Sequence, residues 1–380
     1  MDYIFFQHYW WAILSLLGGI LVFLLFVQGG QGLLYTIGRT DDERNTIAYS
    51  LGRKWALTFT TLVTFGGAFF ASFPLFYSTS FGGAFYVWML ILFVFVIQAV
   101  GYEFRGRPSN FLGERTFSAF LQINGILGPL LLGTAVATLF TGAQFTVNRL
   151  NLTMIGVPNT ISEWTTPWRG LDALADYRNL SLGLAVLFLS QVLGLQYFIN
   201  DIDDKAIVER SRKRLIYTSI LFLVFFLLFA VSLIFATGYS VDRVSGIISP
   251  ERYKYLHNLL QMPVVTIVFL AGVVSVLWGI WIGATKASRR AIWFSGAGTV
   301  LTVFALLLLA GWNDTSYYPS LTDMQSSLTI YNSSSSKFTL EAMSITSLLI
   351  PFVLAYIWYT WRAMNRKQVT QKEAAEDSNA

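Results

Sequence analysis

The sequence contains no cysteine, and that absence removes several kinds of chemistry at once. Disulfides, thiolate zinc sites, cysteine-ligated iron–sulfur clusters and covalently attached c-type haem all depend on cysteine sulfur. Histidine is almost as scarce, because His8 and His257 are the only two in 380 residues. A metal centre built from several histidines is therefore excluded as well.

Charged residues are also few. They make up 12% of the chain, against about 25% in a typical soluble domain. Hydrophobic residues make up 54%, and the mean hydropathy is +0.56. So few charges cannot cover a water-exposed surface, so we expect lipid to be the main solvent. The net charge of +5 does not indicate a nucleic-acid partner, because the basic residues are spread over many short connections.

Nine segments are apolar and long enough to cross a membrane, which takes about 20 residues. We predict an all-α polytopic membrane protein in which residues 1–361 form a single membrane domain and residues 362–380 a polar, disordered tail. The first segment is too long for the apolar part of a cleaved signal peptide, so we expect it to be the first span. The nine predicted spans are residues 9–37, 55–76, 81–102, 117–140, 180–200, 215–238, 262–283, 291–311 and 342–361.

The basic residues predict the orientation of the chain. None of the predicted spans contains Lys or Arg, so all 26 lie in connections or in the tail. With the N-terminus outside, nineteen of them fall on the cytoplasmic side and seven on the outer side. Because cytoplasmic connections carry the excess of Lys and Arg, we predict an outer N-terminus and a cytoplasmic C-terminus.

Two predicted outer loops are long. Residues 141–179 include an apolar stretch at 170–175 that is typical of a re-entrant or interfacial segment. Residues 312–340 are polar and contain four consecutive serines at 333–336, a composition typical of a flexible linker.

The predicted spans contain no Asp or Glu, although membrane-embedded carboxylates are the usual sign of a proton path. The nearest acids are Glu103 and Asp201, both at predicted cytoplasmic helix ends. The polarity that remains comes from the amides Gln28, Gln31, Gln98, Gln122, Asn124, Gln191, Gln196 and Asn200.

Gln28 and Gln31 are three residues apart and share a helix face, with glycines between and beside them. One interpretation is a wetted patch near the inner surface. The other is hydrogen bonding between close-packed helices. The second is favoured, because neutral amides cannot store a proton at ordinary pH.

Glu103 leaves the predicted third span beside Arg105 and Arg107. It could serve as a proton antenna or as an interfacial charge paired with one of these arginines, and the sequence leaves both interpretations open. Neither histidine is placed to bind haem inside the bundle, and we interpret Met89, Met262 and Met343 as packing residues. With no phosphate loop, carboxylate pair or nucleophile–base set, the residues predict no metal site and no catalytic centre in this chain.

Several passages resemble subunit II of the cytochrome bd-type quinol oxidases. The similarity is spread from the first span to the last and is weakest around residues 141–180 and 240–260. The first block consists of YWW at 9–11, QGGQG at 28–32, GRTDDER at 38–44, Trp55, GGAFFASFPLFY at 66–77 and GYEFR at 101–105. The second consists of Tyr318 and Pro319, SLTIYN at 327–332, SSS at 334–336, and Thr339 and Leu340.

The resemblance implies a fold and a function. Subunit II of this family has nine transmembrane helices, in two four-helix bundles plus one peripheral helix, and pairs with a similar subunit I. Subunit I is expected to hold haems b and d and the quinol site, so this chain would bind no haem itself. The complex would oxidise quinol, reduce dioxygen to water and support the membrane potential of a bacterial cytoplasmic membrane. A small single-span subunit, membrane lipid and a structural quinone are further expected partners, and nucleic acid is not.

The departures from the family bear on proton delivery. Many members have aspartate where this chain has Gln28, Gln31 and Ala56, and some have one at Asn332; the family's aspartates are linked to proton delivery. One hypothesis is a water path past Gln28, Gln31 and Trp55 that is entered from Glu103. The other is that protons reach the oxygen site mainly through subunit I.

A secondary transporter is the main alternative function. Such proteins have internal repeats with interrupted helices in both halves. The glycine-rich first span has no matching segment in the second half of this chain, so the oxidase interpretation is favoured. A purely structural membrane subunit is a third interpretation.

Overall fold

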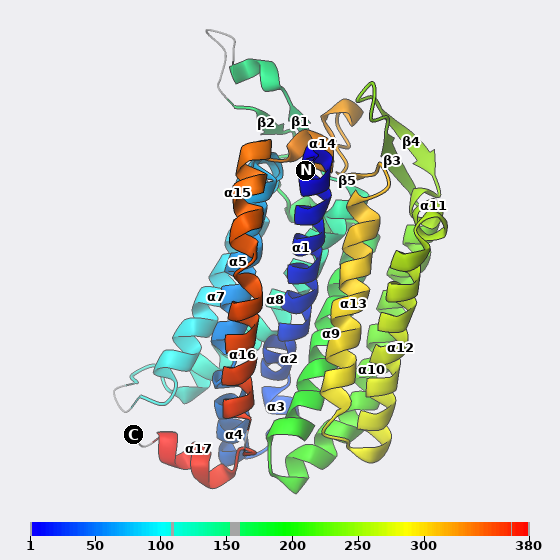
Figure 1. The fold of residues 1–380 in the computed structure, drawn as a ribbon. Coiled ribbons are helices and arrows are strands. Elements are labelled where there is room, and N and C mark those ends of the chain that lie inside the picture. Colours follow the sequence, from blue (N-terminus) through cyan, green and yellow to red (C-terminus); the bar gives the residue numbers. More distant parts are fainter. Residues whose placement is uncertain (1, 108–109, 153–159, 366, 379–380) are drawn as a thin grey trace.

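The computed structural model describes residues 2–107, 110–152, 160–365 and 367–378. Long helices run side by side, with the N-terminus and short strands at one end and the C-terminus at the other (Figure 1). We call the first the strand end. We call the second the tail end, which carries α4 (Asp41–Gly52) and α17 (Gln371–Ser378).

The remaining helices follow in chain order. They are α1 (Tyr3–Leu24), α2 (Phe26–Gly32), α3 (Leu34–Ile37), α5 (Trp55–Ser72), α6 (Pro74–Phe76), α7 (Phe85–Phe104), α8 (Glu114–Thr141), α9 (Tyr177–Asp201), α10 (Lys205–Ile234), α11 (Lys254–Gln261), α12 (Pro263–Lys286), α13 (Ala291–Gly311), α14 (Ile330–Ser333), α15 (Lys337–Ser347) and α16 (Ile350–Met364). A π-helical turn spans Tyr77–Gly82, and 3-10 turns span Arg149–Leu152, Leu171–Ala175 and Met324–Ser326.

Among the described residues, eight helical runs are long and apolar enough to cross a membrane. The pair α15 and α16, bent by 41° at a short break, makes a ninth if it counts as one span. The predicted all-α polytopic fold with about nine spans is therefore confirmed. The last predicted span, residues 342–361, corresponds to this bent pair, whereas α13 has the predicted bounds 291–311.

The long helices pack in two groups. α1, α5, α7 and α8 form one group, and α9, α10, α12 and α13 form the other. Contacts of α1 with α13 and of α8 with α9 join the two. No described side chain of α16 is buried, so this helix lies at the periphery. The arrangement agrees with the two bundles and one peripheral helix that the resemblance implies.

The first predicted span, residues 9–37, begins earlier and is interrupted. α1 begins at Tyr3, and the helix breaks at Leu25 and Leu33. Between the breaks, glycines bring α2 against the backbone of α9. A Cβ added to Gly29 would lie 1.9 Å from the carbonyl oxygen of Ser190. Such close approach between membrane helices requires small residues.

Two other helices end before the predicted positions. The helix that begins at Trp55 ends at Ser72 instead of residue 76, because Pro74 has no N–H for the helix ladder and starts the short α6. The segment predicted as residues 215–238 is helical from Lys205 to Ile234 and then enters a strand at Thr237.

Three short antiparallel hairpins cover the strand end. β1 (Phe145–Val147) pairs with β2 (Ser162–Trp164), and β3 (Thr237–Val241) pairs with β4 (Ile248–Arg252) in the register Val241 to Ile248. β5 (Ser316–Tyr318) pairs with β6 (Leu328–Thr329). In the first loop, the apolar stretch predicted at 170–175 forms the 3-10 turn Leu171–Ala175, which packs against α8 and α9.

The serine-rich run is not a flexible linker. Ser333 is buried, and its hydroxyl lies 2.6 Å from that of Tyr317. Ser336 caps α15 by accepting a hydrogen bond from the backbone N–H of Thr339. Thr329 and Asn332 form a capping box on α14. Composition alone would suggest a linker, but the run belongs to the second block of the family resemblance, and its hydroxyls cap α15 and bond to the buried Tyr317.

The described part of the tail also differs from the predicted disorder. Val369 is fully buried, and its backbone pairs with that of Ile202 at the end of α9. The side-chain amide of Gln368 donates to the carbonyl oxygens of Asn200 and Ile202. α17 then packs against α4. Backbone pairing and two buried apolar side chains, Val369 and Ala374, hold a segment whose polar composition alone predicts no structure. Arg366, which the sequence places in this tail, lies outside the described residues.

Candidate functional site

Two amide side chains of α2 donate hydrogen bonds to side chains of α7. The side-chain N–H of Gln28 donates to the Oε1 of Gln98 at 3.3 Å. The side-chain N–H of Gln31 donates to the hydroxyl oxygen of Tyr102 at 2.8 Å. Gln28 and Gln31 are one helical turn apart on α2, as Gln98 and Tyr102 are on α7. Both hydrogen bonds therefore join the same face of α2 to the same face of α7. The prediction that Gln28 and Gln31 make interhelical hydrogen bonds is therefore confirmed.

Asn124 of α8 completes a group that we call the amide cluster: Gln28, Gln31, Gln98 and Asn124. A Cβ added to Gly128 would lie 3.4 Å from the side-chain nitrogen of Asn124 and 3.7 Å from the Cγ of Gln28. These two amides therefore face the same glycine. All four side chains are at most 1% exposed.

Glycines explain how three helices bring these amides together. A Cβ added to Gly125 of α8 would lie 2.3 Å from the backbone nitrogen of Gly32 on α2. The two backbones are in contact, so no larger residue fits at Gly125 without moving a helix. The glycines of residues 28–32 thus allow α2 to lie close to its neighbouring helices, and the glutamines of the same segment supply polar side chains to the interior.

The amide cluster has unused hydrogen-bonding capacity. Within the described part of the chain, no partner is found for the Oε1 atoms of Gln28 and Gln31, the Nε2 of Gln98, or either amide atom of Asn124. Each buried polar atom left without a partner costs about 1–3 kcal/mol. Buried polar groups of this kind are the usual binding places of internal water.

A cavity of about 1080 Å³ lies beside the cluster at the tail end. It is lined by residues from α4, α5, α7, α8 and α17, among them Trp55, Tyr102 and Glu103. The rings of Trp55 and Tyr102 are stacked, with centroids 5.9 Å apart and planes 16° from parallel. The structure therefore brings Gln31, Trp55 and Glu103 to one place, with Tyr102 in direct contact with both Gln31 and Trp55.

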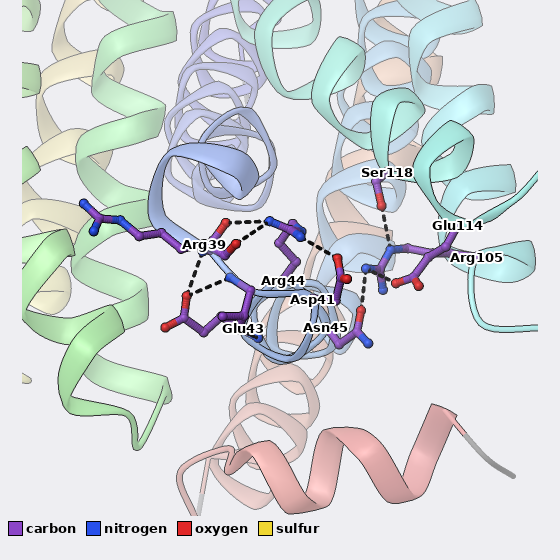
Figure 2. Close-up of polar contacts among 10 residues, drawn as sticks. Arg39, Asp41, Glu43, Arg44, Asn45, Arg105, Glu114 and Ser118 are labelled. Carbon is purple, nitrogen blue, oxygen red and sulfur yellow. Dashed lines mark hydrogen bonds and ion pairs between the residues drawn. The ribbon is translucent and has the colours of Figure 1, made fainter.

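The charged groups of the cavity are paired. Figure 2 shows Arg105, just after α7, between Asn45 of α4 and Glu114 of α8. Its guanidinium donates to the Oδ1 of Asn45 at 2.6 Å and to the hydroxyl of Ser118 at 2.8 Å, and it forms an ion pair with Glu114. Burial lowers the pKa of Arg105, and the Glu114 carboxylate opposes that shift.

Glu103 pairs with Arg107 and not with Arg105. Both members of this ion pair are more than half exposed, with side-chain exposures of 60% and 58%. An exposed pair one helical turn apart contributes little to stability. Glu103 therefore stands at the solvent side of the cavity. The ion pair agrees with the interfacial interpretation, and the antenna interpretation remains a hypothesis.

α4 is fixed by its own N-terminal contacts, which Figure 2 also shows. Glu43 and Thr40 form a capping box, and the Glu43 carboxylate also accepts from the backbone N–H of Arg39 at 2.7 Å. Arg210 of α10 forms an ion pair with Glu43 at 2.6 Å. Arg44 pairs with Asp41 at the same end. The motif at residues 38–44 thus holds the helix that leads into Trp55.

A buried ionisable group nearby was missed by the sequence analysis. Lys54, directly before Trp55, is 0% exposed, and no described atom hydrogen-bonds to its Nζ. That Nζ lies 5.1 Å from the ring centroid of Trp361, a cation–π contact. Lys54 was used only as a sign of orientation, because a lysine at a predicted span boundary is normally solvated.

The burial of Asp201 was also not predicted, because an acid at a predicted span boundary is normally solvated. Its carboxylate accepts from the hydroxyl of Ser50 at 2.5 Å and from that of Tyr197 at 3.0 Å, and it lies 3.9 Å from Arg53. The side chain is 1% exposed. The sequence signal that could have found it is weak: an acid in the last turn of a helix, where the helix dipole disfavours negative charge.

The residues present do not fit a haem. The ring of His8 at the strand end lies against Trp312 and Tyr331, and that of His257 bonds to Glu251. Met89 is 63% exposed on α7, and Met262 and Met343 pack against the apolar core. In the described ranges no group of three or more His, Asp or Glu side chains is placed to hold a metal ion. Haem ligation in a bundle needs ligands that project inward from facing helices.

Comparison with known proteins adds an independent line of evidence. The sequence model described as "Cytochrome bd terminal oxidase subunit II" matches residues 6–364. The chain is 26% identical to the "Probable cytochrome oxidase subunit 2" of Haemophilus influenzae, over 96% of this chain and 95% of that protein. It is 24% identical to the "Cytochrome bd-I ubiquinol oxidase subunit 2" of Escherichia coli, over 100% and 99%.

A solved structure shares the fold. The bd oxidase from Geobacillus thermodenitrificans contains a chain that superposes with a TM-score of 0.57, at 12% sequence identity, over 96% of this chain and 98% of that one. At so low an identity the match concerns the arrangement of the helices.

Proposed function

Because the chain belongs to the cytochrome bd terminal oxidase subunit II family, we propose that it is the haem-free subunit of a bd-type oxidase that oxidises quinol and reduces dioxygen to water. The observation that carries this proposal is the family match over residues 6–364, together with relatives matched over nearly their whole length. A secondary transporter is not supported.

The expected partner is subunit I, which would carry haems b and d and the quinol site. Those haems would supply electron transfer and oxygen reduction. Among the described residues, His257 bonds to Glu251, His8 lies against Trp312 and Tyr331, and no group of three or more His, Asp or Glu side chains is placed to hold a metal ion. We propose that subunit II holds subunit I in the membrane and leaves the redox chemistry to it. A small single-span subunit, a structural quinone and bound lipid complete the proposed assembly.

The proposed location is the bacterial cytoplasmic membrane, with the strand end outside and the tail end in the cytoplasm. The distribution of basic residues supports this orientation, since the connections at the tail end hold the larger share of Lys and Arg. The large cavity beside Trp55 would then open toward the cytoplasm, the side from which protons are taken up.

For this chain we propose a hydrated proton path that enters at Glu103 and passes Trp55, Gln31 and Gln28. The cavity reaches Trp55 and Glu103, and the unpartnered amide oxygens of Gln31 and Gln28 continue the polar surface inward. The competing hypothesis is that protons reach the oxygen site mainly through subunit I. If that hypothesis holds, Glu103→Gln and Gln31→Leu variants will keep full turnover in an assembled complex.

The experiment that tests the proposed function is deletion of the gene for this chain in its own host, with other terminal oxidases inhibited or removed. Quinol-driven oxygen uptake by membranes should be lost and should return when the chain is supplied again. Unchanged oxygen uptake, with normal bd-type haem bands, would contradict the proposal.

A further inference from the structure

Among the described residues, Tyr102 is the residue that both bonds to the amide cluster and lines the cavity. Its hydroxyl oxygen accepts from Gln31 at 2.8 Å, and its side chain lines the cavity. None of the four amide-cluster residues lines that cavity. Within the described residues, a continuous polar connection from the cavity to the amides therefore runs through this hydroxyl.

Packing holds the ring of Tyr102 in this position. The ring stacks on Trp55, and a Cβ added to Gly52 would lie 3.4 Å from its Cδ1 and Cε1 atoms. The end of α4 and the start of α5 thus fix the ring from two sides. With the ring held, the hydroxyl can exchange partners only by rotating its proton.

The hydrogen-bond pattern leaves that proton available. Because the Tyr102 oxygen accepts from Gln31, its own O–H is free to donate, and the Oε1 of Gln31 has no described partner. A hydroxyl can accept on one side while it donates on the other. The amides lack this ability, since they cannot take up and release a proton at ordinary pH.

We infer that the Tyr102 hydroxyl transfers protons from cavity water to water bound at the amide oxygens of Gln31 and Gln28. This inference deepens the proposed proton path and rests on it. A proton from cavity water binds the hydroxyl oxygen while the hydroxyl's own proton passes inward. One O–H bond forms and one breaks, so the tyrosine ends as it began and no electron is transferred.

The charged groups around the transfer point favour a neutral tyrosine that passes protons without keeping them. On α7 and just beyond it, Glu103 pairs with Arg107; Arg105 pairs with Glu114 of α8. Arg53, directly after α4, lines the same cavity. Among the described residues of α2, which contributes Gln31, there is no charged side chain. No carboxylate contacts the hydroxyl in the described structure, so transfer depends on the O–H group itself.

The test is Tyr102→Phe in the complete oxidase, because phenylalanine keeps the stacked ring and removes only the oxygen. The matched control is Tyr86→Phe, which removes the same atom from a 47% exposed tyrosine on the same helix at the strand end. Haem content and quinol-driven oxygen uptake are measured from pH 6 to pH 9, with proton uptake by the reconstituted complex followed by a pH-sensitive dye.

The account predicts that Tyr102→Phe keeps its haem bands but slows proton uptake and turnover by about 100-fold or more, since a positioned proton-transfer group typically contributes about 10²–10⁴-fold. The loss should grow as the pH rises, because protons become scarcer. Tyr86→Phe should match the wild type. Equal proton uptake in the two variants, or a Tyr102→Phe loss that is the same at every pH, would overturn the inference.

A second variant keeps the test decisive if Tyr102→Phe does not assemble. Gln31→Met removes the inner partner of the hydroxyl and should give the same loss, and any assembled double variant should lose no more than either single one. Wild-type turnover in Gln31→Met, with an unchanged pH profile, would also overturn the inference. If wild-type complex shows no quinol oxidase activity, the proposed function fails; if Glu103→Gln slows turnover while Tyr102→Phe does not, only this inference fails.

Discussion

At the scale of single residues, glycines determine whether the polar interior can form. Gly125 and Gly32 let α8 and α2 touch, and this contact brings Asn124 next to Gln28. Glycine in a helix normally costs stability relative to alanine. Here that cost is accepted at positions where a methyl group would collide with the backbone of a neighbouring helix.

Gly125→Ala should therefore be strongly destabilising. Its Cβ would lie 2.3 Å from the backbone nitrogen of Gly32, which cannot move without shifting α2. Overpacking of this kind costs about 1–3 kcal/mol. The matched control is Gly67→Ala on α5, whose Cβ would meet nothing within 4 Å. Thermal unfolding of the detergent-solubilised complex should show a lower midpoint for Gly125→Ala alone; equal midpoints would contradict the packing argument.

A second residue-scale prediction concerns Glu251 in β4. Burial raises the pKa of Glu251, but hydrogen bonds from His257 and Lys254 lower it by more than burial raises it. The net shift of the pKa is therefore downward from the ordinary value of 4.5. A carboxyl whose folded pKa is depressed stabilises the protein above its unfolded pKa, and this contribution is lost as the pH falls through the folded value.

Glu251→Gln should therefore lower the unfolding temperature slightly at pH 7, since the carboxylate is 31% exposed and screened by solvent. The difference from the wild type should vanish as the pH is lowered below about 4, within the range where carboxylates protonate. Unfolding midpoints across pH 3–7 test this. A difference that stays constant over the whole range would show that the carboxylate charge is not the cause.

At the scale of elements, the apolar helices could be predicted because charged residues and tryptophans mark their ends. α13 follows Arg290 and ends before Trp312, and its bounds were predicted correctly. The caps at Ser336 and Thr329 were not predicted, although each bonds only three residues along the chain, because the serine-rich composition indicated a loop. The break after α1 was not predicted either. The pattern placed Gln28 and Gln31 on one face. It did not identify Tyr102 as the partner of Gln31, since a tyrosine near a membrane surface is usually an interfacial anchor.

A prediction at the scale of elements concerns the stability of the junction of α4, α9 and α16. Buried Asp201 lies 3.9 Å from the partly buried Arg53 and interacts electrostatically with the buried Lys54. Removing one member of a buried ion pair typically costs about 3–5 kcal/mol. Asp201→Asn should lower the unfolding midpoint by several degrees and loosen α16, whose Trp361 covers Lys54. The control, Asp203→Asn, changes an exposed acid two residues away. Equal midpoints for the two variants would contradict the assigned role of Asp201.

At the scale of the whole molecule, polarity is divided between the two ends. The strand end is closed by hairpins and capped helices, and the tail end holds the large cavity with its paired charges. Between them, α16 exposes several large apolar side chains, including Phe352, Tyr356 and Trp358. Described residues that do not fit a haem, a polar cavity at one end and a large apolar surface agree with the proposed role beside a redox partner in lipid.

The most direct test of the central claim is to purify this chain from its native membrane in mild detergent and record the reduced-minus-oxidised visible spectrum. The account predicts co-purification with a larger haem-bearing subunit, bands of haems b and d, and quinol-driven oxygen uptake. A chain that purifies alone and colourless from membranes would contradict it.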